Sequence, residues 1–170
     1  MKSALVFYSH YGNTAHVAGE FSEALKKIGS VDNYELEYRG GRPNLLMRAW
    51  YRLFPAAVKL VQPHLDMEKY DLLCLGIPVW GGRPSTAITK YLFLCKNLRG
   101  KKVICFFVYS IEISARRCFN YVRNVLRKKG QPLIIDVFIP WGKVHDKDFL
   151  DKEINNAIQK ATASSLANPA

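Results

Sequence analysis

Five short runs of β-branched, aromatic and other apolar residues alternate along this chain with amphipathic stretches. The runs lie at residues 3–8, 34–38, 71–77, 102–109 and 133–139. This alternation is typical of strands joined by helices that cross over a parallel sheet. The first, third and fourth runs are apolar almost throughout, as are interior strands of a sheet covered on both faces. In the second run, tyrosine and leucine alternate with glutamate, so we expect that strand at an edge of the sheet.

The stretches between the runs carry helix signals. Apolar residues recur at helical spacing before Gly29 and before Gly130, and Pro84 stands where a helix would open. Right-handed crossovers leave few ways to connect five such strands. We therefore predict an α/β fold with a doubly wound, five-stranded parallel sheet in the strand order 2-1-3-4-5. A chain of 170 residues suits one such domain, residues 1–170, with residues 161–170 expected to fray as a tail.

Residues 39–69 form an insertion between the second and third strands that is too long for a plain loop. Its apolar residues keep helical spacing until Pro55 interrupts them, so we predict two short helices. These apolar residues are Leu46, Ala49, Trp50, Leu53 and Phe54. The segment is also basic, because Arg48, Arg52 and Lys59 are interspersed among them. We interpret it as a helix that covers the core, with contact to an anionic membrane surface as the alternative.

The net charge of +11 is unusual and is concentrated in one segment. Residues 96–129 contain ten lysines and arginines and one acid, Glu112. Charge bears on partners and solubility rather than on fold. The segment indicates a solvated basic face, a surface for an acidic redox partner protein, or contact with an anionic membrane. We expect no nucleic-acid binding, because no DNA- or RNA-binding motif accompanies the charge.

The cysteines and the N-terminus bear on compartment and metal binding. The four cysteines form no CxxC pair and fall inside apolar patterns, at Cys74, Cys95, Cys105 and Cys118. We expect buried thiols, and neither a disulfide framework nor a metal site. The apolar run that begins at Ala4 is far shorter than the core of a signal peptide, so we expect a cytoplasmic protein.

Two polar, glycine-containing segments follow the first and third strands. The first reads Ser9-His10-Tyr11-Gly12-Asn13-Thr14 and leads directly into a helix. Backbone N–H groups and short polar side chains at a helix N-terminus favour a bound phosphate, and Gly12 lets the backbone come close to it. The second segment extends from Gly76 through Pro78-Val79-Trp80-Gly81-Gly82 to Ser85. Both segments follow strands that flank the reversal of strand order, so we expect them to meet at one crevice.

These two segments resemble the flavodoxin family, and the resemblance extends over nearly the whole chain. It implies non-covalently bound FMN. The phosphate would lie in the loop that contains Ser9, His10, Tyr11, Gly12, Asn13 and Thr14, and Tyr11 departs from the family's pattern. The flavin ring would contact Pro78, Val79, Trp80, Gly81 and Gly82. Residues 109–114 lack the glycines of the family's third loop, and Ser110 is the candidate there for contact with the ring edge.

The resemblance implies an electron-transfer carrier with no catalytic side chain of its own, because the flavin supplies the redox chemistry. The alternative is an FMN-dependent oxidoreductase that acts on a quinone or another small substrate, membrane-delivered or porphyrin-like. The basic insertion and the altered third loop favour this alternative. A binding module without flavin is the third interpretation.

Overall fold

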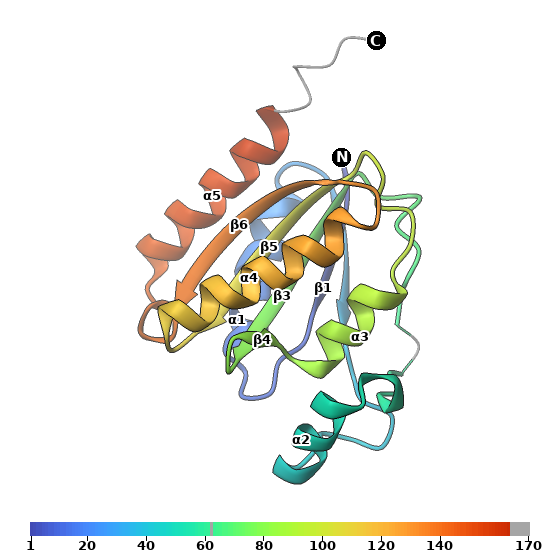
Figure 1. Cartoon of the computed structure of the whole chain (residues 1–170). Helices are drawn as coiled ribbons and strands as arrows, with labels where there is room; N and C mark the ends of the chain where they lie inside the picture. Colours follow the sequence, from blue (N-terminus) through green and yellow to red (C-terminus); the bar gives the residue numbers. More distant parts are fainter. Residues whose placement is uncertain (62, 164–170) are drawn as a thin grey trace.

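A central sheet with helices on both faces forms the body of this protein (Figure 1). The structure is a computed structural model that describes residues 1–61 and 63–163. The strands are β1 (Lys2–Phe7), β2 (Ser30–Glu35), β3 (Leu72–Trp80), β4 (Arg83–Pro84), β5 (Lys102–Tyr109) and β6 (Leu133–Pro140). The α-helices are α1 (Asn13–Lys26), α2 (Leu45–Leu53), α3 (Thr86–Leu94), α4 (Glu112–Arg127) and α5 (Lys147–Ala163). Two short 3-10 helices are η1 (Pro55–Ala57) and η2 (Trp141–Lys143).

The five long strands are parallel and lie in the order β2-β1-β3-β5-β6. The two-residue β4 pairs antiparallel with β3 and stands outside this path. Numbered without β4, the order is 2-1-3-4-5, so the predicted doubly wound α/β topology is confirmed. The order reverses between β1 and β3, which are hydrogen-bonded neighbours.

Two apolar clusters cover the two faces of the sheet. On one face, Phe21 of α1 stacks on Phe106 of β5 with ring centroids 4.7 Å apart, and α5 completes the cluster. On the other face, α3 and α4 pack through buried residues such as Tyr91 and Val122. The four cysteines are buried within these clusters with free thiols, as predicted. The described residues contain no cluster of three or more histidine, cysteine or acidic side chains suited to a metal ion.

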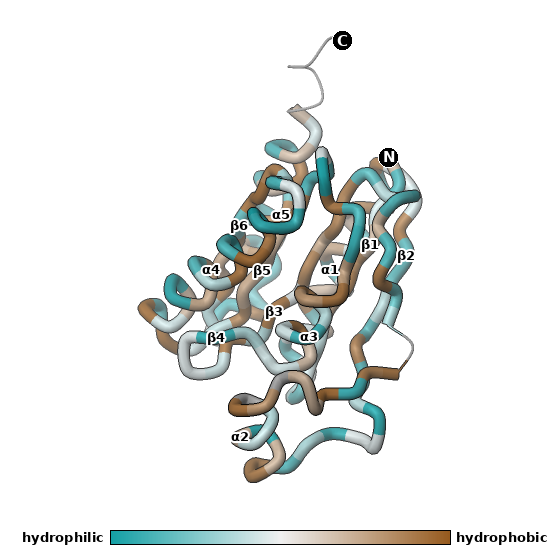
Figure 2. The backbone as a smooth tube through the Cα atoms, turned by 45° about the vertical axis from the view of Figure 1, so that its right-hand side comes forward, coloured by the Kyte–Doolittle hydropathy of each residue, from teal (hydrophilic) through white to brown (hydrophobic). Residues whose placement is uncertain are grey.

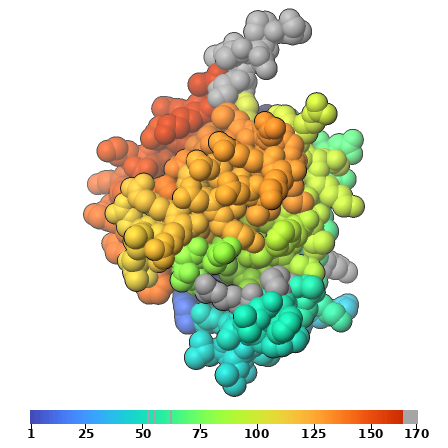
Figure 3. Space-filling model, viewed as in Figure 1, coloured from blue at the N-terminus to red at the C-terminus, as the bar shows by residue number. Residues whose placement is uncertain are grey.

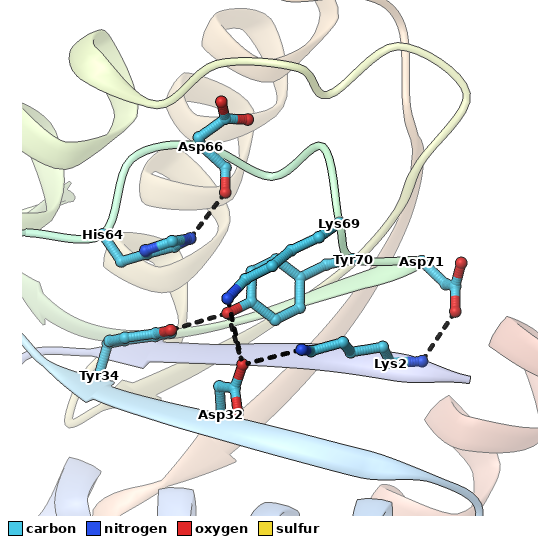
Figure 4. A network of polar contacts seen from close by, with 8 residues as sticks. All are labelled: Lys2, Asp32, Tyr34, His64, Asp66, Lys69, Tyr70 and Asp71. Carbon is cyan, nitrogen blue, oxygen red and sulfur yellow. Dashed lines mark hydrogen bonds and ion pairs between the residues drawn. The ribbon is translucent and has the colours of Figure 1, made fainter.

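The edge strand β2 begins earlier than its sequence pattern indicated. We predicted residues 34–38, but the strand spans Ser30–Glu35 and pairs with β1 at the end of the strand order, so its edge position is confirmed and its bounds were wrong. Its first half is polar because those side chains find partners. Asp32 accepts a 2.7 Å hydrogen bond from the Tyr70 hydroxyl and lies 3.6 Å from Lys2 and 3.8 Å from Lys69 (Figure 4).

The insertion contains the two short helical segments that we predicted, α2 and η1. The interpretation of α2 as a helix that covers the core was wrong. Its Tyr51 is buried, where the ring stacks on Tyr38 at 5.8 Å, but its leucines and Trp50 are exposed. The reason is its position, because α2 lies beyond the carboxyl ends of the strands and not over a face of the sheet (Figure 1).

The last helix is longer than expected. Residues 161–163 belong to α5 and Ala161 is fully buried, so the prediction of a frayed tail was wrong for this part. Residues 164–170 lie outside the described residues. Across 1–61 and 63–163, no helix has the length and apolar character needed to cross a membrane.

Candidate functional site

The two polar segments meet in one crevice at the carboxyl ends of β1 and β3. Most of the predicted site residues line this crevice, namely Ser9, His10, Tyr11, Asn13, Thr14, Pro78, Val79 and Trp80. Val108 from the end of β5 and Trp141 from η2 complete its walls. The sheet explains the convergence, because parallel neighbours that end at the same edge bring their following loops together.

The loop from Ser9 to Thr14 is built to accept an anion. Gly12 has a φ of +91°, a backbone conformation that glycine adopts without steric cost, and α1 starts at the next residue. No side chain of the described residues caps the helix, and its first turn contains no acidic residue. Thr14 is buried, and so is Ser9. The first N–H groups of α1 therefore have no side-chain partner, and the helix dipole favours negative charge there.

Ser9 is the most informative residue of this loop. Its side-chain oxygen is buried and has no hydrogen-bond partner within the part of the chain that the structure describes. Leaving a buried hydroxyl unpaired costs about 1–3 kcal/mol. A ligand with acceptor oxygens that occupies the loop would remove this cost.

Next to the loop, aromatic rings form a compact group around Trp80. The Tyr8 hydroxyl lies 3.1 Å from His10 Nδ1, and Trp80 makes edge-to-face contacts with both rings at 5.8 Å. Burial, followed by the positive charges of Arg48 and Arg42, lowers the pKa of His10. Burial, with Tyr38 as the next cause, raises the pKa of Tyr8 to about 12. Both rings are therefore favoured in their neutral forms near pH 7.

Residues 78–84, which the sequence analysis placed after the third strand, belong to a β-hairpin. β3 does not end at residue 77 but continues through Trp80, which pairs with Arg83 across a two-residue turn. Gly81 and Gly82 form this turn with φ values of +55° and +79°. Two positive φ values at the central positions match a type I′ turn, whose twist suits the flanking strands. The hairpin therefore fixes the backbone of Trp80 at the crevice.

Comparisons with known proteins were made on the sequence and on the structure. No protein-family model matches the chain, and no curated protein matches it. Solved structures match it over nearly its whole length. A flavoprotein in complex with FMN from Lactobacillus acidophilus NCFM is 20% identical, with a TM-score of 0.63 over 89% of this chain and 97% of that one. Oxidised flavodoxin 2 from Bacillus cereus is 22% identical, with a TM-score of 0.61 over 97% of this chain and 99% of that one.

A third match is the apo form of an NADH:FMN oxidoreductase, which is 14% identical. Its TM-score is 0.67 over 96% of this chain and 90% of that one. At sequence identities of 14–22%, the similarity to these structures is evidence for the fold alone. The chain has a flavodoxin-like fold. In this fold the crevice described above lies at the switch point of the strand order, where α/β sheets bind ligands.

Four of the predicted site residues are not among the described residues that line this flavodoxin-like crevice, namely Gly12, Gly81, Gly82 and Ser110. Ser110 is exposed and is not among the described residues that line the crevice, because β5 ends at Tyr109 and the chain turns outward into α4. Glu112, which follows it, pairs with Arg116 at 2.6 Å. Trp141, which the sequence analysis missed, lines the crevice and is 49% exposed. Its position in the sequence could have identified it as a site residue, because it is an aromatic residue directly after the last parallel strand.

Trp80 separates the narrow crevice from a larger cavity. The crevice itself has a volume of about 20 Å³, whereas the cavity on the other side of Trp80 has about 510 Å³. The cavity lies between α2, the β3–β4 hairpin, α3 and α4, and no acidic residue is among its described lining residues. Two of its arginines lie on aromatic rings: Arg48 over Trp80 at 4.2 Å and Arg83 over Tyr121 at 4.4 Å.

Proposed function

We propose that this protein binds FMN non-covalently in the crevice and acts as an electron-transfer carrier. The observation that carries the proposal is the buried, unpaired hydroxyl of Ser9 beside the uncapped N-terminus of α1. A phosphate group in this loop would accept from the hydroxyl and from backbone N–H groups, which are charge-assisted hydrogen bonds. Structural neighbours described as an FMN complex and as a flavodoxin support the choice of FMN.

The residues of the crevice suit the two ends of this cofactor, which would lie across the crevice's mouth because a volume of about 20 Å³ does not hold a flavin. Ser9, Gly12, Asn13 and Thr14 would hold the phosphate, and the aromatic surfaces of Trp80 and Trp141 suit a flat ring. FMN supplies the redox chemistry when it is bound. The protein would bind FMN, orient its ring and shield the ring from water. The neutral rings of Tyr8 and His10 add no net charge at the inner wall.

A comparison of FMN with riboflavin tests the assignment of the phosphate loop. Riboflavin lacks the phosphate, so its affinity should be lower by at least about a hundredfold if two or more charge-assisted hydrogen bonds are lost. Quenching of flavin fluorescence on titration with the protein measures both affinities. Equal affinities, or no binding of FMN, would contradict the proposal.

One observation favours the second candidate function, an FMN-dependent oxidoreductase. The cavity beside Trp80 has a size typical of small-molecule sites, and its aromatic rings and arginines suit a flat acceptor such as a quinone, including one delivered from a membrane. A potentiometric titration of the FMN-loaded protein distinguishes the two functions. Two well-separated one-electron steps support the carrier, and one two-electron step supports the oxidoreductase.

A basic surface beside the crevice supports an acidic redox protein as the partner. Arg116 and Arg117 are exposed in α4 close to its start, which is the end of the helix that follows β5. Arg117 lies against the hairpin, since a Cβ atom built at Gly82 would be 3.5 Å from its Cβ. Electrostatic attraction of this kind acts mainly on the association rate and is screened by salt. We expect association with an acidic partner to slow as ionic strength rises.

A further inference from the structure

Helix α2 and Phe54 after it expose a continuous apolar surface that nothing in the described chain covers. Six large side chains are 43–80% exposed within ten residues, and they are Leu45, Leu46, Met47, Trp50, Leu53 and Phe54. Contacts to the body of the protein come from the other side of the helix. Tyr51 stacks on Tyr38, and Arg48 lies over Trp80. A cluster of this kind marks an interaction site, whereas single exposed apolar residues do not.

The chain around this surface is basic throughout. Residues 39–61 contain five basic residues and no acidic residue, namely Arg39, Arg42, Arg48, Arg52 and Lys59. A helix with apolar residues on one side and basic residues beside them is typical of segments that lie in the interface of a bilayer. Anionic lipid headgroups complement this charge.

The position of α2 makes its apolar surface accessible to a large flat partner. The helix projects from the lower end of the molecule, past the carboxyl ends of the strands (Figures 1 and 3). In the hydropathy view, apolar segments of α2 lie at this extremity, away from the sheet (Figure 2). The helix is capped at its N-terminus, where the Asn44 side chain accepts a 2.9 Å hydrogen bond from the Met47 N–H.

We propose that α2 docks this protein on the surface of an anionic lipid bilayer. The leucines, Met47 and Phe54 would enter the boundary between headgroups and acyl chains, and the exposed cations Arg39, Arg42 and Lys59 would attract the lipid phosphates, whereas Arg48 stays on Trp80. A second copy of the chain is a poorer occupant, because a symmetric contact would bring two segments of charge +5 together. This proposal does not depend on FMN binding.

Vesicle sedimentation with the full chain tests the docking. The vesicles contain either phosphatidylglycerol with phosphatidylcholine or phosphatidylcholine alone. The test variant is Leu46→Gln with Leu53→Gln, and the matched control is Ile111→Gln with Ile113→Gln, whose isoleucines are 59% and 60% exposed outside α2, at the start of α4. Wild type and control should bind anionic vesicles, and the test variant should bind at least about tenfold more weakly.

A second measurement reports which side chain enters the lipid. Brominated lipids quench tryptophan at the acyl boundary, so binding should quench the fluorescence of wild type and of Trp141→Phe. Trp50→Phe should lose most of this quenching. Three results would each overturn the proposal: equal binding to both kinds of vesicle, equal loss in the test and control variants, or a dimer that depends on Leu46 and Leu53 without vesicle binding. All variants replace exposed or partly exposed side chains, and circular dichroism verifies that they fold.

Discussion

The guanidinium of Arg48 lies over the indole of Trp80, with its central carbon 4.2 Å from the ring centroid. This contact links α2 of the insertion to the end of β3. Trp80 in turn touches His10 edge to face. The insertion therefore places a positive charge close to the only histidine that lines the crevice among the described residues. Burial is the largest cause of the lowered pKa of His10, and Arg48 is the next.

We predict that Arg48→Met raises the pKa of His10 toward its ordinary value of 6.5. Removing the positive charge makes protonation of the ring less unfavourable. The measurement is an NMR titration of the imidazole protons, with Lys90→Met, on α3, as the control for general loss of charge. Because the pKa of the folded state is lowered, His10 lowers stability as the pH falls below about 6.5, and the variant should weaken this dependence. An unchanged His10 titration would contradict the coupling.

The phosphate loop should control retention of the cofactor. Replacing Ser9 and Thr14 together by alanine removes two hydrogen bonds to a charged group, each worth about 1.5–3 kcal/mol. FMN affinity should therefore fall at least about a hundredfold in a fluorescence titration. The matched control is Ser22→Ala, which should keep its FMN affinity. Ser22 lies in α1, as Thr14 does, but its hydroxyl accepts a hydrogen bond from Asn33. Equal affinities in the double variant and wild type would exclude this loop as the phosphate site.

Two glycine-to-alanine substitutions should change stability in opposite directions. Gly81 has a φ of +55°, so alanine there adopts a left-handed conformation at a cost of about 1–2 kcal/mol. Gly19 is exposed inside α1, and a Cβ atom at that position would meet nothing within 4 Å. Alanine there should stabilise the protein by up to about 1 kcal/mol through its helix propensity. Denaturant titrations measure both changes, and stabilisation by alanine at position 81 would argue against the hairpin conformation.

Structural features that depend on residues close together in the chain could be predicted from the sequence. The loop from Ser9 to Thr14 was found because a strand, short polar residues and a helix start stand in order. The dipeptide Gly81-Gly82 was interpreted only as part of a segment that contacts the flavin ring, although two glycines between extended segments also predict a type I′ hairpin, which the structure contains. The signal for the hairpin was therefore present in the sequence and was not used.

Other features depend on contacts between residues far apart in the chain, which the spacing of residue types does not reveal. The periodicity of α2 is that of a helix over a core, and only its position beyond the strands leaves Leu46 exposed. The start of β2 was missed because Asp32 is polar, and its partner Tyr70 lies 38 residues further along the chain. Trp141 was missed because we considered as site residues only those that follow the first, third and fourth predicted strands.

The network around Asp32 should make the edge strand sensitive to acid. The hydrogen bond from Tyr70 is the main cause that lowers the pKa of Asp32, and Lys2 and Lys69 act in the same direction. A lowered pKa stabilises the folded state above the ordinary value of 3.8, and the effect is lost as the pH falls through the lowered pKa. Asp32→Asn should therefore reduce stability at pH 7 and not at pH 2. Asp151→Asn on α5 is the control, and identical pH profiles for Asp32→Asn and wild type would contradict this role.

The four cysteines should be unreactive in the folded protein. All four are buried, and burial raises the pKa of the Cys95 thiol to about 11 and also raises the pKa of the Cys74 thiol. Thiolate is the reactive form, so at pH 8 a disulfide reagent such as dithionitrobenzoate should label them only when the protein opens. Urea should release four reactive thiols with the same midpoint as loss of circular dichroism. Phe93→Cys, at a side chain that is 55% exposed, gives the rate of an accessible thiol. A native cysteine that reacts at that rate would instead indicate an accessible thiol with a redox role of its own.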